Sequence, residues 1–330
     1  MGRFLEKERV RLVNFKQASA CFSDEARADG VYKKKARPFC LAQDYSEENL
    51  FVGIRQPCLE YFAAKEIKWH DALNRRPSNH LCDSQVCCVN FLFPFTRDPD
   101  ALATLLRPFF PGLLRMLPME DADYFVAFEW IGQQNYLREK LPRHGKRTRG
   151  ANFTSTDAAV RFEREDGKKQ IALIEWKYTE SYSRSSYKIA RSGTDRTAIY
   201  QHLYARQDFP LRKELLPDFS ALFYEPFYQL FRQQALANEM EMARELDSDV
   251  VSVLHIAPAQ NTDFLRVTSP ELRHLGQSAI AVWKKLVRQQ SRFSSIETER
   301  FFGGFAIDAH PSLQSWWEYI TARYPWILPR

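Results

Sequence analysis

The feature that most constrains the fold of this chain is a pair of short apolar segments joined by a tight glycine turn. The first is Asp157-Ala-Ala-Val-Arg-Phe162 and the second is Ile171-Ala-Leu-Ile-Glu175-Trp-Lys177, with Glu165-Asp166-Gly167 between them. Runs of this length around a glycine turn predict a β-hairpin. Because side chains alternate along a strand, Glu175 and Lys177 share one face of the second strand. Burying two such charges is costly unless they are paired or hold a metal.

The length of the turn decides whether Asp157 joins this pair. A three-residue loop with Gly167 in the left-handed conformation pairs Arg164 with Lys168 and places Asp157 opposite Glu175 on the same face. A two-residue turn would instead pair Asp157 with Trp176 and point it away. We predict the three-residue loop, or a bulge with the same effect.

Two adjacent carboxylates beside a lysine point to metal-assisted chemistry. Paired carboxylates suit a hard cation such as Mg²⁺, which takes oxygen ligands and keeps several waters. The ammonium can orient or deprotonate an attacking water, or stabilise developing phosphate charge. This set fits hydrolysis of a phosphodiester. The alternative is a charged strand edge with a cross-strand ion pair.

The arrangement Asp157…Glu175-Trp176-Lys177 resembles the D…(D/E)-x-K signature of the PD-(D/E)XK nuclease superfamily, with Thr156 where that family usually has proline. The resemblance implies that Asp157 and Glu175 bind Mg²⁺ or Mn²⁺ and that Lys177 is the catalytic lysine. The wider chain is similar to a restriction endonuclease branch of that superfamily. The segments that carry this wider similarity are Asn79–Gln85, Phe128–Trp130, Asp157–Tyr182 and Glu225–Arg232.

The resemblance implies a mixed α/β (α+β) fold with a core of one helix, three strands, a helix and a strand. We expect this core in residues 119–260, with an N-terminal region, 1–118, packed on it. A C-terminal helical extension, 261–330, completes one unit. The order requires a third strand after Lys177. Residues 225–246 predict an amphipathic helix and residues 249–256 the next strand. Asp98 before Pro99 predicts the cap of another helix that runs through Leu106.

The resemblance also suggests further catalytic residues. Glu129 is the only charge in residues 124–131, which read as a strand or a buried helix, and a glutamate on the first core helix often assists the metal in the superfamily. Pairing of Glu129 with an arginine is the alternative. Gln201 lies on a predicted helix after the lysine, where some branches carry a glutamine, although the expected Gln-x-x-x-Tyr is here Gln201-His-Leu-Tyr204. Glu180 is an alternative metal ligand.

Two cationic segments flank the hairpin and are candidates for nucleic-acid binding. The first, a loop over residues 138–149, includes Lys146, Arg147 and Arg149; the second interleaves tyrosines with basic residues and includes Tyr182, Arg184 and Lys188. Such segments suit phosphate contacts and base stacking. Charge runs are more commonly solvated surface, and the net charge of +6 says little by itself. Gln229, Arg232 and Gln233 are further candidates on the substrate side.

Other features argue against competing sites. Glu66-Ile67-Lys68 repeats the Glu-x-Lys pattern, but it follows a predicted helix without an Asp-bearing hairpin and reads as a solvated helix face. The spacing of Cys82, Cys87 and Cys88 matches no common zinc pattern, so these thiols read as reduced core residues. The sequence has no apolar run that could span a membrane and no secretory signal. We therefore expect a cytoplasmic protein.

These observations predict a metal-dependent DNA endonuclease that acts in restriction, a role often performed by homodimers on palindromic sites, although the sequence does not determine the oligomeric state. One rival is a catalytically inactive nucleic-acid-binding protein of the same fold. Another is a nuclease of DNA repair or RNA processing. A third is a structural protein in which the hairpin charges form a surface ion pair. The recognition sequence cannot be assigned, because no helix-turn-helix or zinc-finger pattern is present.

Overall fold

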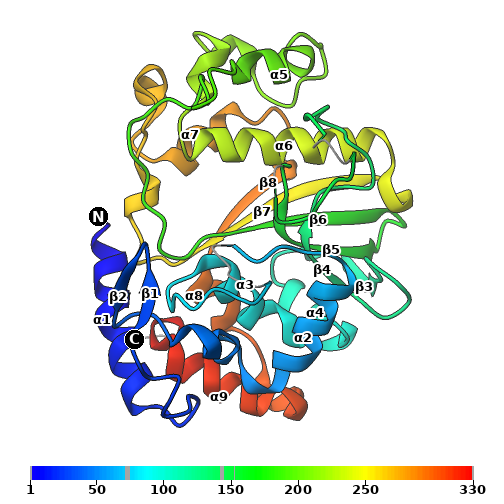
Figure 1. Cartoon of the computed structure of the whole chain (residues 1–330). Coiled ribbons are helices and arrows are strands. Elements are labelled where there is room, and N and C mark those ends of the chain that lie inside the picture. The colour runs from blue at the N-terminus through cyan, green and yellow to red at the C-terminus, as the bar shows by residue number, and fades with distance from the viewer. Residues whose placement is uncertain (1, 71–74, 142–144, 152, 329–330) are drawn as a thin grey trace.

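A computed structural model of the chain describes residues 2–70, 75–141, 145–151 and 153–328. Its centre is a mixed sheet in the order β3-β5-β6-β7-β8, in which β4 also pairs with β5 (Figure 1). The strands are β3 (Leu113–Leu117), β4 (Val126–Trp130), β5 (Thr156–Arg164), β6 (Lys169–Trp176), β7 (Val250–Ala257) and β8 (Phe293–Glu297). The pairs β3–β5, β4–β5 and β5–β6 are antiparallel, whereas β6–β7 and β7–β8 are parallel.

The predicted hairpin is present with the predicted register. The Arg164 N–H donates to the Lys168 carbonyl at 2.8 Å, and the Gly167 N–H donates to the Arg164 carbonyl at 3.0 Å. Gly167 has a φ of 76°, which is the left-handed conformation that glycine adopts without strain. The last ladder pair is Ala158 with Ile174, so the next positions along the two strands, Asp157 and Glu175, are opposite one another. The three-residue loop is confirmed.

Two hydrophobic clusters lie on the two faces of the sheet. Above it in Figure 1 are α6 (Phe227–Met242) and α7 (Ala279–Leu286), with α5 (Arg196–Tyr204) farther out. Below it are α2 (Val52–Ala64), α3 (Ser84–Leu92), α4 (Pro99–Leu106), α8 (Thr298–Gly303) and α9 (Gln314–Arg323). The lower cluster contains buried side chains from Phe4 to Ile327. Both faces of the central strands are therefore covered, which explains their nearly continuous apolar character.

The first helix and a small hairpin lie together at one side of the lower layer (Figure 1). They are α1 (Arg3–Ala18) and a small hairpin of β1 (Gly30–Tyr32) and β2 (Lys35–Arg37). None of the helices in the described parts of the chain is long and apolar enough to cross a membrane.

Local sequence signals place several helices correctly. The Asp98 carboxylate accepts the Ala101 N–H at 2.9 Å, and α4 begins at Pro99 and ends at Leu106 as predicted. Asp83 caps α3 in the same way by accepting the Val86 N–H at 2.8 Å. The helix predicted over 225–246 is shorter and ends at Met242. The buried, unpaired state of Cys82, Cys87 and Cys88 confirms their assignment to the core.

One expectation about strand order is wrong. In the described chain no strand lies between Lys177 and α5; the third strand is β4, which precedes the hairpin and pairs with the start of β5. β3 pairs with the other end of β5, near Arg161 and Arg164, so β3 and β4 share one edge of that strand. The polar segment after Lys177 has no alternating apolar face to bury, which explains why it forms no strand there.

Candidate active site

Glu175 and Lys177 form a buried ion pair at the end of β6. Their side chains are 1% and 7% exposed, and the Lys177 ammonium contacts Oε1 of Glu175. Burial raises the pKa of the Glu175 carboxyl, and the neighbouring ammonium opposes that rise. Burial by itself would lower the pKa of Lys177, but the carboxylates around it outweigh this effect and raise its pKa well above the ordinary lysine value. Lys177 is therefore an ammonium at neutral pH.

The side chain of Asp157, on β5, forms a hydrogen bond with the backbone of the neighbouring strand β6. Its carboxylate accepts the Trp176 N–H at 2.7 Å, and the neighbouring Thr156 hydroxyl donates to the Ile174 carbonyl at 2.7 Å. The backbone pairing of β5 with β6 ends at Ala158 and Ile174, and beyond that point these two side-chain hydrogen bonds hold the strands together. Burial, followed by the negative charges of Glu175 and Glu129, raises the Asp157 pKa well above its ordinary value. Glu175 is thus close enough to Asp157 to oppose its ionisation.

The donors at this point of the sheet suit a hard cation. Oε2 of Glu175 is buried and has no hydrogen-bond partner, although buried polar atoms are nearly always paired. A second carboxylate, Asp157, lies on the adjacent strand. Within the described residues no group of three or more His, Cys, Asp or Glu side chains could hold a metal ion. A cation here would therefore take its other ligands from water, substrate or backbone, as Mg²⁺ commonly does.

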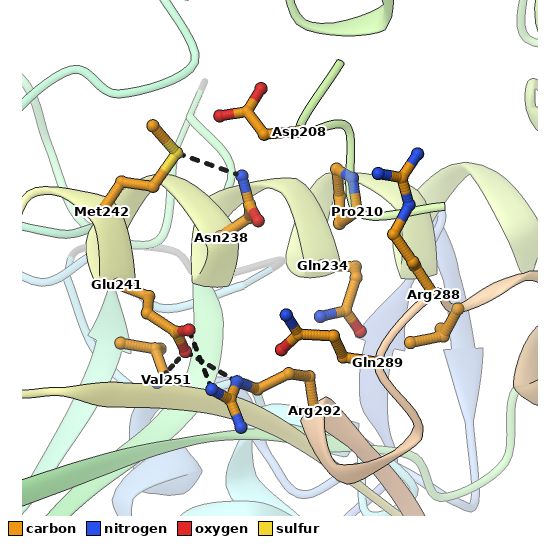
Figure 2. A pocket seen from close by; sticks show the side chains of 11 residues that line it. Asp208, Pro210, Gln234, Asn238, Glu241, Met242, Val251, Arg288, Gln289 and Arg292 are labelled. Atoms are coloured by element: carbon orange, nitrogen blue, oxygen red, sulfur yellow. Dashed lines mark hydrogen bonds and ion pairs between the residues drawn. The ribbon is translucent and has the colours of Figure 1, made fainter. Parts of the chain in front are cut away.

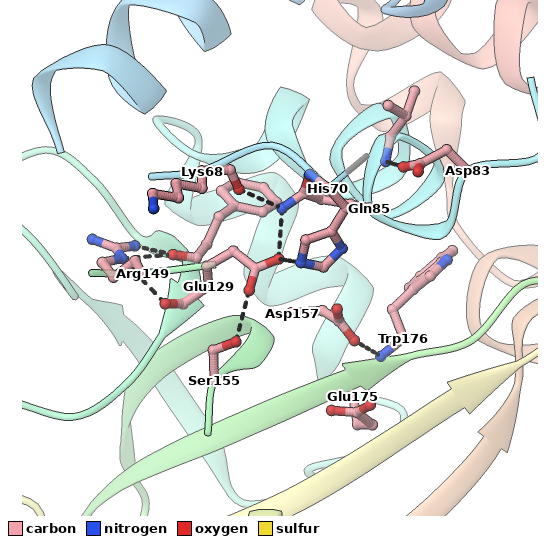
Figure 3. A network of polar contacts seen from close by, with 12 residues as sticks. Lys68, His70, Asp83, Gln85, Glu129, Arg149, Ser155, Asp157, Glu175 and Trp176 are labelled. Atoms are coloured by element: carbon pink, nitrogen blue, oxygen red, sulfur yellow. Dashed lines mark hydrogen bonds and ion pairs between the residues drawn. The ribbon is translucent and has the colours of Figure 1, made fainter. Parts of the chain in front are cut away.

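Glu129 lies on β4, and its carboxylate is held by three side chains (Figure 3). The Gln85 amide donates to Oε1 at 2.7 Å and the Ser155 hydroxyl donates to Oε2 at 2.7 Å. The His70 Nε2 lies 3.5 Å from Oε1. Glu129 itself is 1% exposed. The carboxylate forms no ion pair with an arginine among the described residues, so the alternative reading as an arginine partner is wrong.

The backbone at Glu129 is unusual for a strand. Its φ is 49°, a left-handed conformation that costs energy for a residue with a side chain. The flanking pairs Phe128–Ala158 and Trp130–Thr156 place Glu129 level with Asp157 across the sheet. The conformation turns Glu129 toward α3, where Gln85 meets it. Of the two structures that the sequence allowed for residues 124–131, the strand is the one present, so Glu129 lies on a strand and not on the first core helix.

Two further groups reach the cluster from β7 and α6. His255 is the parallel ladder partner of Glu175, is 1% exposed, and lies 3.1 Å through Nδ1 from the Ser295 hydroxyl. Burial and then the charge of Lys177 lower its pKa to about 3. The guanidinium of Arg232 lies 4.6 Å from the Tyr228 ring centroid, and its charge opposes the rise in the Glu175 pKa.

The first cationic segment is largely engaged inside the protein. Arg149 is bound to Glu120 at 2.6 Å, to the Tyr61 hydroxyl at 3.1 Å and to the Phe128 carbonyl. Arg147 donates to the carbonyls of Ile131 and Gly132. Lys146 is exposed and pairs with Glu66. Residues 142–144 of this predicted loop lie outside the described residues.

The second segment stays at the surface. Arg184 and Lys188 are exposed, while Tyr182 is half-buried with a buried hydroxyl beside the charge of Lys177. Glu180 accepts the Tyr178 N–H at 2.6 Å, and its charge is felt by Lys177 and Glu175.

Two other sequence candidates lie away from the cluster. Gln201 is exposed on α5, which lies beyond α6 from the sheet, and it does not join the carboxylates (Figure 1). The copy Glu66-Ile67-Lys68 lies past the end of α2 with both charges exposed, so it is solvated, though not on a helix. Gln233 on α6 is buried and donates to the Ser155 carbonyl, which brings α6 to the start of β5.

Sequence reasoning did not single out Gln85 or His255 as site residues. Each carries a signal in the sequence: Gln85 is a polar residue in the first turn of a mostly apolar helix, and His255 is the only ionisable side chain in a buried strand. A buried polar group of this kind requires a partner. The sequence does not identify that partner, because it comes from a distant segment.

A family model described as Restriction Endonuclease associating with ARP matches residues 9–325. No curated protein and no solved structure matches the chain.

Proposed function

Because this chain belongs to the family Restriction Endonuclease associating with ARP, we propose that it is a metal-dependent endonuclease that hydrolyses DNA phosphodiester bonds. The reaction would take place at Asp157, Glu175 and Lys177. The observation that carries the proposal is the end of β6, where a buried carboxylate with one unpartnered oxygen lies beside a buried ammonium and opposite a second carboxylate.

The element order supports a PD-(D/E)XK core. The sequence α3, β4, β5, β6, α6, β7 gives one helix, three antiparallel strands, a helix and a parallel strand. α4 and β3 are inserted between α3 and β4, and α5 is inserted before α6. The Asp and the Glu-x-Lys lie on adjacent antiparallel strands, as the signature requires.

In the proposed reaction the carboxylates bind the metal and the lysine contacts the water and the phosphate. Asp157 and Glu175 would hold Mg²⁺ or Mn²⁺, which supplies Lewis acidity toward a phosphate and lowers the pKa of a bound water. Lys177 lies beside Glu175 as a buried ammonium, and the surrounding negative charges raise its pKa. It would orient the attacking water and stabilise charge that develops on the phosphate. Glu129, level with Asp157 on the adjacent strand, would assist the metal site by adding a third negative charge near the cation.

The exposed basic residues near the carboxylate cluster would contact the DNA. Arg184 and Lys188 lie on the exposed segment that follows Lys177. Phosphate contacts from such side chains position a duplex without reading its sequence. Arg149 does not belong to this DNA-contacting surface, because its guanidinium donates to Glu120 and to the Phe128 carbonyl inside the protein.

The test is cleavage of supercoiled plasmid with Mg²⁺ or Mn²⁺ by the intact protein and by Glu175→Gln and Lys177→Met. We expect both variants to lose activity by about 100-fold or more. Lys68→Met is the matched control, because Lys68 belongs to the exposed second Glu-x-Lys copy and its side chain is solvated. It should cleave like the parent protein.

Two outcomes would overturn the proposal. Equal cleavage by Lys177→Met and the parent would remove this site from the reaction. Absence of cleavage with either metal, together with salt-sensitive DNA binding, would instead favour the inactive nucleic-acid-binding protein. A panel with single-stranded DNA and RNA would separate restriction-type activity from repair or RNA processing.

A further inference from the structure

A cavity of about 320 Å³ lies between α6 and the segment that joins α7 to β8 (Figure 2). Its lining includes Pro210, Gln234, Val251, Val287, Arg288 and Gln289. Val251 is at the start of β7, whereas His255, beside the catalytic cluster, is four residues further along. At about 3.3 Å per residue this separates the two sites by roughly 13 Å along the strand. The cavity is therefore distinct from the carboxylate cluster.

The cavity contains a buried polar group with an unsatisfied acceptor. Gln234 is 2% exposed, and its Oε1 has no hydrogen-bond partner among the described residues. Figure 2 shows the amides of Gln234 and Gln289 turned toward the same space. A buried amide oxygen without a partner is rare in native proteins and indicates a missing ligand or an ordered water.

The two carboxylates that line the cavity, Asp208 and Glu241, are each paired with an arginine. Glu241 is neutralised by Arg292 through contacts of 2.7 and 2.9 Å. Asp208 is paired with Arg206, at 2.6 and 2.8 Å, and the same guanidinium also donates to Glu239 at 2.7 Å. Arg288 is exposed, donates to the Gln207 carbonyl at 2.8 Å, and forms no ion pair within the described chain. The rim thus keeps one cation available for a phosphate.

We infer that this cavity binds adenine joined to a phosphate-bearing sugar, with the base at Gln234 and the phosphate at Arg288. A glutamine amide presents one donor and one acceptor, which match the N6 amino group and N7 of adenine in a bidentate pair. Pro210, which is partly exposed, would contact one face of the base, and the buried side chains of Val251 and Val287 complete the apolar part of the lining. The volume is at the lower end of the range for small-ligand sites, roughly 300–1,000 Å³.

The same chemistry has two sources: a free adenine nucleotide, or an adenine that is unstacked from a DNA strand. Calorimetric titration of the intact protein with AMP and with a single-stranded oligodeoxyadenylate distinguishes them. Saturable AMP binding assigns the site to a nucleotide. Binding of the oligonucleotide without AMP binding, when it depends on Gln234, assigns the site to a DNA base. Neither arm requires nuclease activity, so the result is independent of the proposed function.

The variants test the two halves of the site separately. Gln234→Leu should weaken binding about tenfold or more, whereas Gln277→Leu, an exposed glutamine outside the cavity, should leave it unchanged. Arg288→Gln should weaken AMP about tenfold and leave adenosine unaffected. GMP and CMP should bind about tenfold less tightly than AMP. The circular dichroism spectrum of each variant shows whether it is folded.

The inference is overturned if neither AMP nor the oligonucleotide binds saturably at millimolar concentration, which would leave the cavity to ordered water. It is also overturned if AMP, GMP and CMP bind equally, or if binding survives both Gln234→Leu and Arg288→Gln. The Arg288 variant keeps the test decisive if Gln234→Leu does not fold, because Arg288 lies at the exposed rim.

Discussion

The side-chain amide of Gln85 on α3 donates to the carboxylate of Glu129 on β4 at 2.7 Å, although 44 residues separate them in the chain. Glu129 has a left-handed backbone conformation and lies level with Asp157 across the sheet. A strained conformation persists only where surrounding contacts enforce it. The Gln85 contact is one of those that hold Glu129 beside the candidate metal ligands.

Gln85→Leu should therefore lower both stability and activity. Loss of a buried hydrogen bond to a charged group costs about 2 kcal/mol, which should appear in denaturant unfolding. Release of Glu129 should reduce plasmid cleavage about tenfold or more, if the site acts as proposed. Gln133→Leu, at an exposed glutamine, is the matched control. Unchanged stability in Gln85→Leu would show that this contact does not hold Glu129.

Lys177→Met should destabilise the protein in the absence of metal. It leaves Glu175 buried without its partner, and breaking a buried ion pair from one side costs about 3 kcal/mol or more. The double variant Lys177→Met/Glu175→Gln should recover most of this loss, because no buried charge remains. A double-mutant cycle by urea unfolding measures the coupling. Additive effects of the two changes would contradict the buried pair.

His255 should make the protein sensitive to acid. Burial, then the charge of Lys177, lowers its pKa from 6.5 to about 3, so the folded state resists protonation of the ring. Below pH 6.5 the unfolded state binds a proton at this ring that the folded state does not bind. The free energy of unfolding is therefore at its full value above pH 6.5 and decreases as the pH falls toward 3. Within that window the free energy of unfolding should fall by about 1.4 kcal/mol per pH unit from this group.

The measurement is urea unfolding at several pH values between about 4.5 and 7.5. His255→Gln should flatten the dependence of stability on pH, whereas His274→Gln, at an exposed histidine, should leave it unchanged. Identical slopes for His255→Gln and the parent protein would mean that the ring is not held neutral in the folded state.

The two groups of basic residues should respond differently to substitution. Arg184→Ala and Lys188→Ala should each reduce the slope of log affinity against log salt by about 1 in DNA binding, with little effect on stability. Arg149→Ala should instead destabilise the fold by roughly 2 kcal/mol, because Glu120 and the Phe128 carbonyl lose a buried donor. Fluorescence anisotropy over a range of salt, with thermal unfolding alongside, separates the two effects. A changed salt slope in a stable Arg149→Ala variant would return Arg149 to the contact surface.

The sequence by itself determined the hairpin and the residues it brings together. Strand alternation and the conformational freedom of Gly167 are local properties, so the register that sets Asp157 opposite Glu175 follows from counting along the chain. Helix caps such as Asp98 are equally local. The family resemblance carried by these residues agrees with the family that the comparison shows.

Tertiary structure decided which distant segments complete the site. Local periodicity does not say which strand occupies the edge of β5, and β4 takes the place that a strand after Lys177 was expected to fill. The contacts of Glu129 with Gln85 and the pairing of Glu175 with His255 join segments 44 and 80 residues apart. Their physical cause is the packing of α3 and β7 against the hairpin, since burial of apolar faces selects neighbours without regard to distance along the chain. The sequence supplied the charged residues at the end of β6, and the fold supplied the groups that hold them.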